Sequence, residues 1–280
     1  MKILLSNDDG VLAPGLAALA QALAEIAEVT VVAPEGERSG SSSALTLDRP
    51  LHPVQLANGY WAVNGFPADC VYVGLNGMFD QSFDLVVSGI NAGANMGDDV
   101  LYSGTVGAAF EGRGMRLPAL AVSLVGVHAK QYRDVENFRV AAAWVRGFVA
   151  QGVPSLAAGH ILNINIPDVR TLAELRHVEV TRMGVRDVSQ PVYSEIDPRG
   201  RKMYWVGKSG DPLGQDHVLN LPAQEIVNNQ LGSASKEQFR TDFAALDDGF
   251  VSITPIRLDA TGYSTLVGLK QALSTDRLLP

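Results

Sequence analysis

The sequence predicts an α/β fold: a doubly wound, Rossmann-like and mostly parallel sheet, followed by a smaller C-terminal region rich in β-hairpins. Short apolar runs alternate with segments of helical periodicity over roughly the first two thirds of the chain, as expected for strands joined by crossover helices. Several of these runs end in loops rich in glycine, asparagine and serine. Beyond Pro167 the pattern changes, and residues 185–240 are polar and turn-rich.

A βαβ unit opens the chain. Residues 3–5 form a short apolar run that ends at polar turn residues, which predicts a buried strand. A helix begins at Pro14, a residue favoured in the first turn, and has apolar residues at helical spacing through Ile26. The β-branched run at 29–33 is the second strand. Two strands separated by one helix predict parallel pairing.

The alternation continues to residue 166. We expect a glycine- and serine-rich loop at 35–43, short antiparallel strands within 45–65, and a second loop at 89–98. Further strands are predicted at 84–88, 120–124 and 161–166, and further helices at 67–75, 103–110 and 135–149. This pattern predicts a Rossmann-like catalytic core over residues 1–184, and a hairpin-rich region with an oligomerisation arm and tail over 185–280.

Composition limits the possible partners. The net charge is -8, from 22 Lys and Arg against 30 Asp and Glu, which disfavours binding to nucleic acid or to an anionic membrane. A small anionic substrate would need a local cation or a helix N-terminus. The single cysteine, Cys70, excludes an internal disulfide. With no signal-peptide core and no run long enough to cross a bilayer, a cytoplasmic protein is expected.

Adjacent carboxylates follow the first strand, in Asn7-Asp8-Asp9-Gly10. In open α/β sheets, ligands bind outside the carboxyl ends of the strands. Where a strand ends and the chain turns, Asp8 and Asp9 can converge on one hard divalent cation, which relieves their repulsion. The alternative is a turn and helix cap built from Asx residues.

Three further segments are predicted to meet this edge. Ser39 lies in a serine-rich loop after the second strand, which alone would read as a flexible linker. Asn91 follows a buried strand and offers a neutral oxygen to a metal, although asparagine is also common in ordinary turns. Ser103 opens a helix of small residues whose free N–H groups suit an anion, although a plain N-cap gives the same pattern.

Several other chemistries lack their motifs. A P-loop, a G-x-G-x-x-G fingerprint after the first strand and a G-x-S-x-G elbow are all absent. Cys70 lies on an apolar helix face and is expected in the core. The five histidines show no zinc spacing and are expected to be structural or exposed: His52, His128, His160, His177 and His217.

Taken together, these segments resemble the SurE family, the survival-protein-E 5'/3'-nucleotidases. The likeness runs in order over most of the chain, and Phe66 departs from it where the family pattern has threonine. The matching stretches are 3–10 (ILLSNDDG), 33–42 (APEGERSGSS), 67–71 (PADCV), 84–95 (DLVVSGINAGAN), 102–109 (YSGTVGAA), 162–167 (LNINIP) and 197–200 (DPRG).

The resemblance implies a metal-dependent phosphatase that hydrolyses nucleoside 5'- and 3'-monophosphates and short polyphosphates. It implies one divalent ion per subunit, Mn²⁺, Mg²⁺ or similar, and a homodimer or homotetramer. The implied metal ligands are Asp8, Asp9, Ser39 and Asn91, with the two aspartates also catalytic, and the implied phosphate-binding residues are Asn95, Ser103, Gly104 and Thr105.

The expected mechanism is attack by a metal-activated water, with either aspartate accepting its proton. A covalent aspartyl-phosphate route is the minor alternative. A nucleotide-binding sensor without turnover is the alternative function, but a sensor does not need paired carboxylates beside the phosphate. A nicotinamide-dependent oxidoreductase is disfavoured by the missing fingerprint.

The region 185–240 also predicts assembly. It is too polar to form its own core, yet it contains a set of large apolar residues that a monomer would expose. Some should pack on the main domain, and the rest on a second copy of the chain. They are Val192, Tyr193, Met203, Tyr204, Trp205, Val206, Val218, Leu219 and Leu221.

Overall fold

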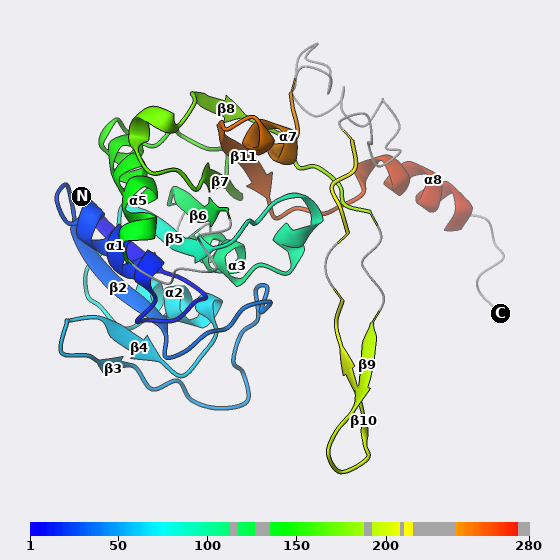
Figure 1. Ribbon diagram of the computed structural model, residues 1–280, viewed down its shortest axis with the longest axis horizontal. Helices are drawn as coiled ribbons and strands as arrows, with labels where there is room; N and C mark the ends of the chain where they lie inside the picture. Colours follow the sequence, from blue (N-terminus) through cyan, green and yellow to red (C-terminus); the bar gives the residue numbers. More distant parts are fainter. Residues whose placement is uncertain (113–116, 127–134, 188–191, 208–209, 215–238, 274–280) are drawn as a thin grey trace.

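The computed structural model describes residues 1–112, 117–126, 135–187, 192–207, 210–214 and 239–273. It confirms an α/β fold built on a mostly parallel sheet, with a separate small hairpin (Figure 1). The strands are β1 (Lys2–Ser6), β2 (Glu28–Pro34), β3 (Val54–Gln55), β4 (Trp61–Val63), β5 (Leu85–Ala92), β6 (Ala119–Val125), β7 (His160–Pro167), β8 (Val178–Val180), β9 (Tyr193–Ile196), β10 (Lys202–Trp205) and β11 (Val251–Arg257). The helices are α1 (Pro14–Leu23), α2 (Pro67–Asn76), α3 (Gly104–Glu111), α5 (Val135–Ala150), α7 (Asp242–Asp247) and α8 (Tyr263–Leu273), with 3-10 turns η1 (Gly97–Leu101) and η3 (Leu172–Glu174).

The main sheet has nine strands in the order β3-β4-β2-β1-β5-β6-β7-β11-β8. Strand β1 pairs in parallel with β2 on one side and with β5 on the other. The chain therefore winds outward in both directions from β1, which makes the β1/β5 boundary the topological switch point. Among the described strands of this sheet, only β3 with β4 and β11 with β7 pair antiparallel.

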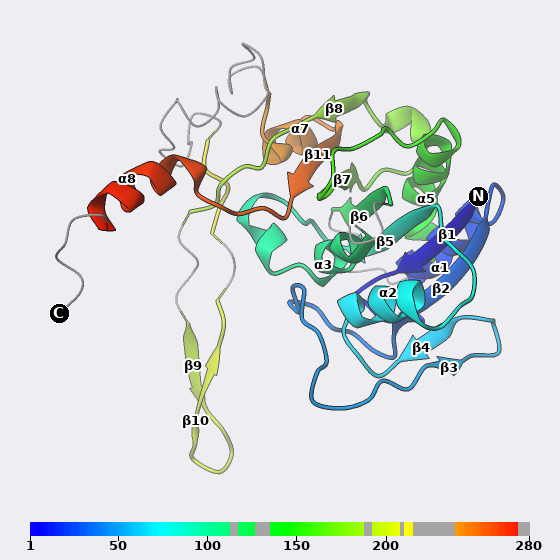
Figure 2. The ribbon, with the colours of Figure 1, turned by 180° about the vertical axis from the view of Figure 1, so that it is seen from behind.

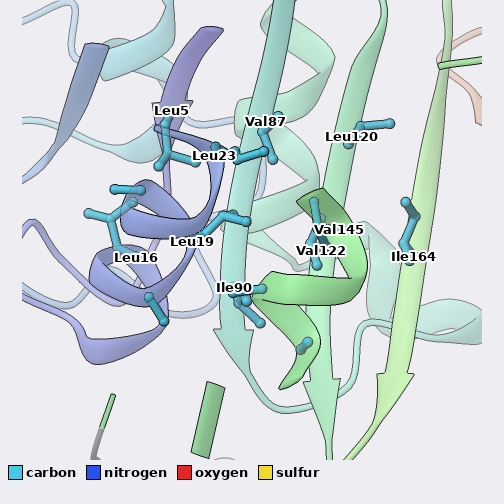
Figure 3. Packing of buried hydrophobic residues seen from close by; sticks show 14 of the residues in the cluster. Leu5, Leu16, Leu19, Leu23, Val87, Ile90, Leu120, Val122, Val145 and Ile164 are labelled. Atoms are coloured by element: carbon cyan, nitrogen blue, oxygen red, sulfur yellow. The ribbon is translucent and has the colours of Figure 1, made fainter. Parts of the chain in front are cut away.

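Helices cover both faces of the sheet. Helices α1 and α5 pack on one face, while α2 and α3 pack on the other (Figures 1 and 2). The helical spacing of Leu16, Leu19 and Leu23 directs all three at the sheet, where Figure 3 shows them beside side chains of β1 and β5. Each large apolar side chain buried in this way contributes about 1.5–3 kcal/mol. This face of the sheet is the larger part of the core.

The structure differs from the predicted elements at three places. Strand β5 was expected to end at residue 88 but continues to Ala92, because β6 supplies pairing partners beyond a register shift between Ser88 and Asn91. Helix α1 ends at Leu23, three residues before Ile26. Within 45–65 only β3 and β4 form, and β4 pairs in parallel with β2.

The C-terminal part contributes to two separate structures. Strands β9 and β10 pair with each other as an antiparallel hairpin that projects from the main body (Figures 1 and 2). Strand β11 instead enters the main sheet between β7 and β8, and α7 packs beside it. The sequence did not predict β11, α7 or α8. Five residues discussed above lie outside the described residues: His128, His217, Val218, Leu219 and Leu221.

Candidate active site

A cavity of about 960 Å³ opens at the carboxyl ends of β1, β2 and β5. Four loops line it, and they are the loops expected at this edge. Two residues next to β10, Val206 and Gly207, also line it. The predicted site residues in its wall are Asp8, Asp9, Ser39, Asn91, Asn95 and Ser103. Six of the eight predicted residues are thus brought together around one cavity.

The other two, Gly104 and Thr105, lie behind Asp8 and not in the cavity wall. The Thr105 hydroxyl donates a hydrogen bond of 2.5 Å to Oδ1 of Asp8. A Cβ on Gly104 would lie 2.5 Å from the Ser41 Oγ and 2.9 Å from the Asp8 Cβ. Only glycine fits there, so the start of α3 packs directly against the carboxylate of Asp8.

Asp8 is a buried carboxylate. Burial raises the pKa of Asp8, and the hydrogen bond from Thr105 opposes that shift by favouring the charged form. Burial removes the water that would otherwise stabilise the negative charge of a carboxylate, and a nearby cation stabilises it instead. This physical state of Asp8 fits a metal ligand.

The remaining proposed ligands present oxygen atoms. Asp9 is half-buried, and its Oδ2 accepts a hydrogen bond from the Ala92 N–H at 3.1 Å. Asn91 donates its Nδ2 to the Gly93 carbonyl at 2.8 Å, which leaves Oδ1 as the atom able to contact a cation. Ser39 donates to a Glu37 carboxylate oxygen at 3.0 Å and keeps its oxygen lone pairs. Two carboxylates with two neutral oxygens suit a hard divalent ion.

The charge of the cavity wall is of one sign. No Lys, Arg or His among the described residues lines the cavity. The charged residues that line it are all acidic: Asp8, Asp9, Glu35, Glu37 and Asp99. An anionic ligand would be repelled from this wall unless a cation entered with it. Within the described part of the chain, no three His, Cys, Asp or Glu side chains are grouped for a metal.

Helix α3 begins at the cavity. Ser103 is its N-cap, because its Oγ accepts from the Val106 N–H at 3.1 Å. The N–H groups of the first helical turn have no partners within the helix and form a site of partial positive charge. Ala13, the N-cap of α1, also lines the cavity, so two helix starts give the wall partial positive charge, and the start of α3 is the one that packs against Asp8.

Sequence reasoning missed the residues that hold the turn η1 beside the cavity. The Gly97 N–H donates to Asp242 Oδ2 at 2.8 Å, across 145 residues of sequence. The Arg186 Nε donates to Asp99 Oδ2 at 2.7 Å. Burial raises the pKa of Asp242, while hydrogen bonds from backbone N–H groups, first that of Gly97, lower it. No local pattern could reveal these contacts.

Ser41 is also close to the site. Its Oγ is buried without a hydrogen-bond partner in the structure and lies against Gly104. An orphaned hydroxyl at this position fits a site that is completed by a ligand. The serine-rich composition of the loop was the only sequence signal for it.

Of the residues expected to be structural, those that the structure describes lie away from the cavity wall. Cys70 is on the buried face of α2, where burial raises the pKa of its thiol. His52, His160 and His177 do not line the cavity. In the part of the chain that the structure describes, no helix has both the length and the apolar character needed to cross a bilayer.

Comparison with known proteins gives one consistent result. The family model described as "Survival protein SurE" matches residues 3–190. A protein of Acinetobacter baumannii (strain AYE) named "5'-nucleotidase SurE" is 54% identical over 273 residues, which cover 98% of this chain and 100% of the relative. A protein of the same name from Legionella pneumophila (strain Paris) is 46% identical over 274 residues, 98% of each chain.

A solved structure agrees. The crystal structure of the SurE protein from Aquifex aeolicus superposes with a TM-score of 0.73 at 33% identity, and covers 98% of this chain and 100% of that one. The similarity therefore extends over the C-terminal part as well as the sheet.

Proposed function

The chain belongs to the survival protein SurE family, and from this membership we propose that it is a metal-dependent 5'-nucleotidase. Relatives at 46–54% identity over nearly the whole chain are named 5'-nucleotidases. We propose nucleoside 5'-monophosphates as the main substrates, with 3'-monophosphates and short-chain polyphosphate as further ones. The products would be a nucleoside and inorganic phosphate.

The acidic wall of the cavity is the observation that supports metal dependence. A phosphate dianion at the start of α3 would face Asp8 and Asp9 across a wall without a basic side chain among its described residues. Asp8, Asp9, Ser39 and Asn91 would hold one divalent cation, for which Mn²⁺ and Mg²⁺ have the required preference for oxygen. When bound, this ion supplies the charge that the phosphate requires and lowers the pKa of a water ligand.

The chain's own groups would do the rest. The N–H groups at the start of α3, together with Ser103 and Asn95, would bind the phosphate and stabilise charge on its oxygens. Asp9, which is half-buried in the wall, or Asp8 would accept a proton from the attacking water. Thr105 would hold Asp8 in position through its short hydrogen bond. In the alternative route one aspartate attacks phosphorus itself and displaces the nucleoside, and water then hydrolyses the acyl phosphate.

The decisive experiment is phosphate release by the purified chain. With saturating Mn²⁺, AMP should be converted to adenosine and phosphate, and a chelator should abolish the reaction. Adenosine 3'-monophosphate and tripolyphosphate, assayed in parallel, define the range of substrates. Binding of AMP without release of phosphate would contradict the proposal and favour a sensor. Rapid quenching followed by acid precipitation tests for a phosphoenzyme and so separates the two routes.

Assembly into a homodimer or homotetramer is the second part of the proposal. Strands β9 and β10 are exposed along their whole length. Tyr204 is 65% and Trp205 61% exposed, and Val206 beside them is 93% exposed. Apolar residues gathered on a projecting hairpin are typical of a surface that packs on a second copy.

A further inference from the structure

We infer that Asn165 and Asn163 of β7 are positioning residues that fix Asn95 at the phosphate. Asn95 lines the cavity, and its contact with phosphate belongs to the proposed function, on which this inference rests. The two asparagines do not line the cavity. They act on the phosphate through the main chain of Asn95.

The contacts are specific to one residue. Asn165 Oδ1 accepts from the Asn95 N–H at 3.0 Å, and Asn165 Nδ2 donates to the Asn95 carbonyl at 2.9 Å. Asn163 Nδ2 donates to the same carbonyl at 2.7 Å. The side-chain amide of Asn165 thus binds both backbone groups of Asn95, and the amide of Asn163 gives the Asn95 carbonyl a second hydrogen bond. Such a pairing fixes the position and the direction of the backbone at that point.

Packing alone does not account for these two amides. Alternate residues of β7, Leu162, Ile164 and Ile166, face the core beneath α1 and α5. Asn163 and Asn165 face the other way and are 0% exposed. An apolar side chain at either position would fill the space and bring no polar group of its own, so what the amides add is their hydrogen bonds to the backbone of Asn95. Asn163 even leaves its Oδ1 without a partner, because its Nδ2 is turned to Asn95. A buried acceptor without a partner destabilises the fold, and such exceptions occur where function requires them.

Ser123 completes the arrangement on the neighbouring strand. Asn95 Nδ2 lies 2.9 Å from the Ser123 Oγ. A hydroxyl can donate as well as accept, so Ser123 can bond the side-chain amide of Asn95 in either of its two orientations. In the orientation turned by 180°, Ser123 would donate to Asn95 Oδ1, and Asn95 Nδ2–H would point away from Ser123. Ser123 also pairs in register with Asn91 on β5 and with Asn165 on β7. One polar row across three strands therefore connects a proposed metal ligand to the proposed phosphate-binding loop.

The consequence for catalysis is geometric. A displacement of about 1 Å in a group that orients a reacting phosphate costs on the order of 100-fold in rate. Asn165→Ala removes both a donor and an acceptor from the Asn95 backbone. We expect it to lower kcat/KM for AMP by about 10- to 100-fold and to weaken inhibition by inorganic phosphate. Asn163→Ala removes one donor, and its effect should be smaller in both assays.

A double-mutant cycle tests the inference on the full chain with Mn²⁺ and AMP. If Asn165 acts through Asn95, then Asn95→Ala combined with Asn165→Ala should lower kcat/KM no further than Asn95→Ala alone. Thr254→Val is the matched control. Thr254 is buried in the same sheet, pairs with Asn163, and has Thr181 as its hydrogen-bond partner. This control should lower the melting temperature yet leave kcat/KM within about twofold, because it does not touch Asn95.

Several results would overturn the inference. The first is that the losses of kcat/KM in Asn95→Ala and Asn165→Ala add in the double mutant, and the second is that Asn95→Ala keeps wild-type kcat/KM. The third is that Thr254→Val loses as much kcat/KM as Asn165→Ala does. The fourth is that Asn165→Ala and Asn163→Ala both keep wild-type kcat/KM. The last comparison stands on Asn163→Ala alone if Asn165→Ala does not fold. A wild-type protein that releases no phosphate from AMP would remove the proposed function and this inference together. An active wild type with unimpaired asparagine variants would remove the inference alone.

Discussion

Thr105→Val separates two roles for a residue near the phosphate. The family resemblance implies that Thr105 contacts phosphate, whereas its hydroxyl in the structure donates to Asp8. Valine keeps the size of the side chain and removes only the hydroxyl. A hydrogen bond to a charged group contributes about 1.5–3 kcal/mol. At 1.4 kcal/mol per tenfold, its loss should weaken Mn²⁺ binding by roughly 10- to 100-fold.

The reason is that the hydrogen bond both orients Asp8 and favours its charged form. Burial raises the pKa of Asp8 and the Thr105 hydroxyl lowers it, so valine leaves the carboxylate harder to ionise. A metal ligand must be ionised to bind, and metal affinity should fall accordingly. Calorimetric titration with Mn²⁺ measures this directly, without turnover.

Thr105→Ser is the control, because serine restores the hydroxyl and should restore most of the Mn²⁺ affinity. Inhibition by inorganic phosphate, measured at saturating Mn²⁺, should be nearly unchanged in Thr105→Val. Wild-type Mn²⁺ affinity together with much weaker phosphate inhibition would refute the reasoning, and would place the hydroxyl on the phosphate instead.

Three further predictions follow from charge and exposure. Asp8→Asn and Asp9→Asn should each abolish turnover at saturating metal. The melting temperature of the metal-free protein should stay the same or rise, because the repulsion between the two carboxylates is relieved. Near wild-type turnover in either variant would contradict the assigned ligands. Burial raises the pKa of Asp242 above 3.8, so the folded state holds this proton to a higher pH than the unfolded chain does. The stability of the wild type relative to Asp242→Asn, from urea unfolding, should therefore be greatest below pH 3.8 and should fall as the pH rises through the folded pKa; a difference that is constant or rises over this range would exclude the effect. Light scattering at micromolar concentration should give the mass of a dimer or tetramer, and a monomeric mass for the active chain would require another role for the exposed hairpin.

The parts of the fold that could be predicted from sequence are those set by local patterns. Residues 3–5 and the helix start at Ser103 carry their own signals, in apolar periodicity and in capping chemistry. The strand predicted at 84–88 ended too early because the glycine and asparagine residues that follow it usually mark turns. Pairing of Asn91 with Ser123, on a strand about thirty residues away, overrides that local preference.

The candidate site was predictable to the same extent. Its members could be grouped because parallel strands bring their carboxyl ends to one edge, and the resemblance added residues that no spacing argument supplies. The partners of those members could not be predicted. Thr105 meets Asp8 across 97 residues, and Asn165 meets Asn95 across 70. Such contacts depend on how the elements pack.

The residues that support the site also bear on the predicted boundary at residue 184. Asp242 and Arg186, which hold η1 beside the cavity, lie beyond it. So does β11, whose removal would expose β7 as an unpaired edge and leave β8 without its partner. We therefore expect residues 1–184, expressed alone, to aggregate or to lack nucleotidase activity, whereas deletion of the β9–β10 hairpin alone should leave a folded main sheet. Circular dichroism and phosphate release from AMP, measured on both truncated chains, test this. A folded and active 1–184 chain would show that the contacts from Asp242, Arg186 and β11 are dispensable.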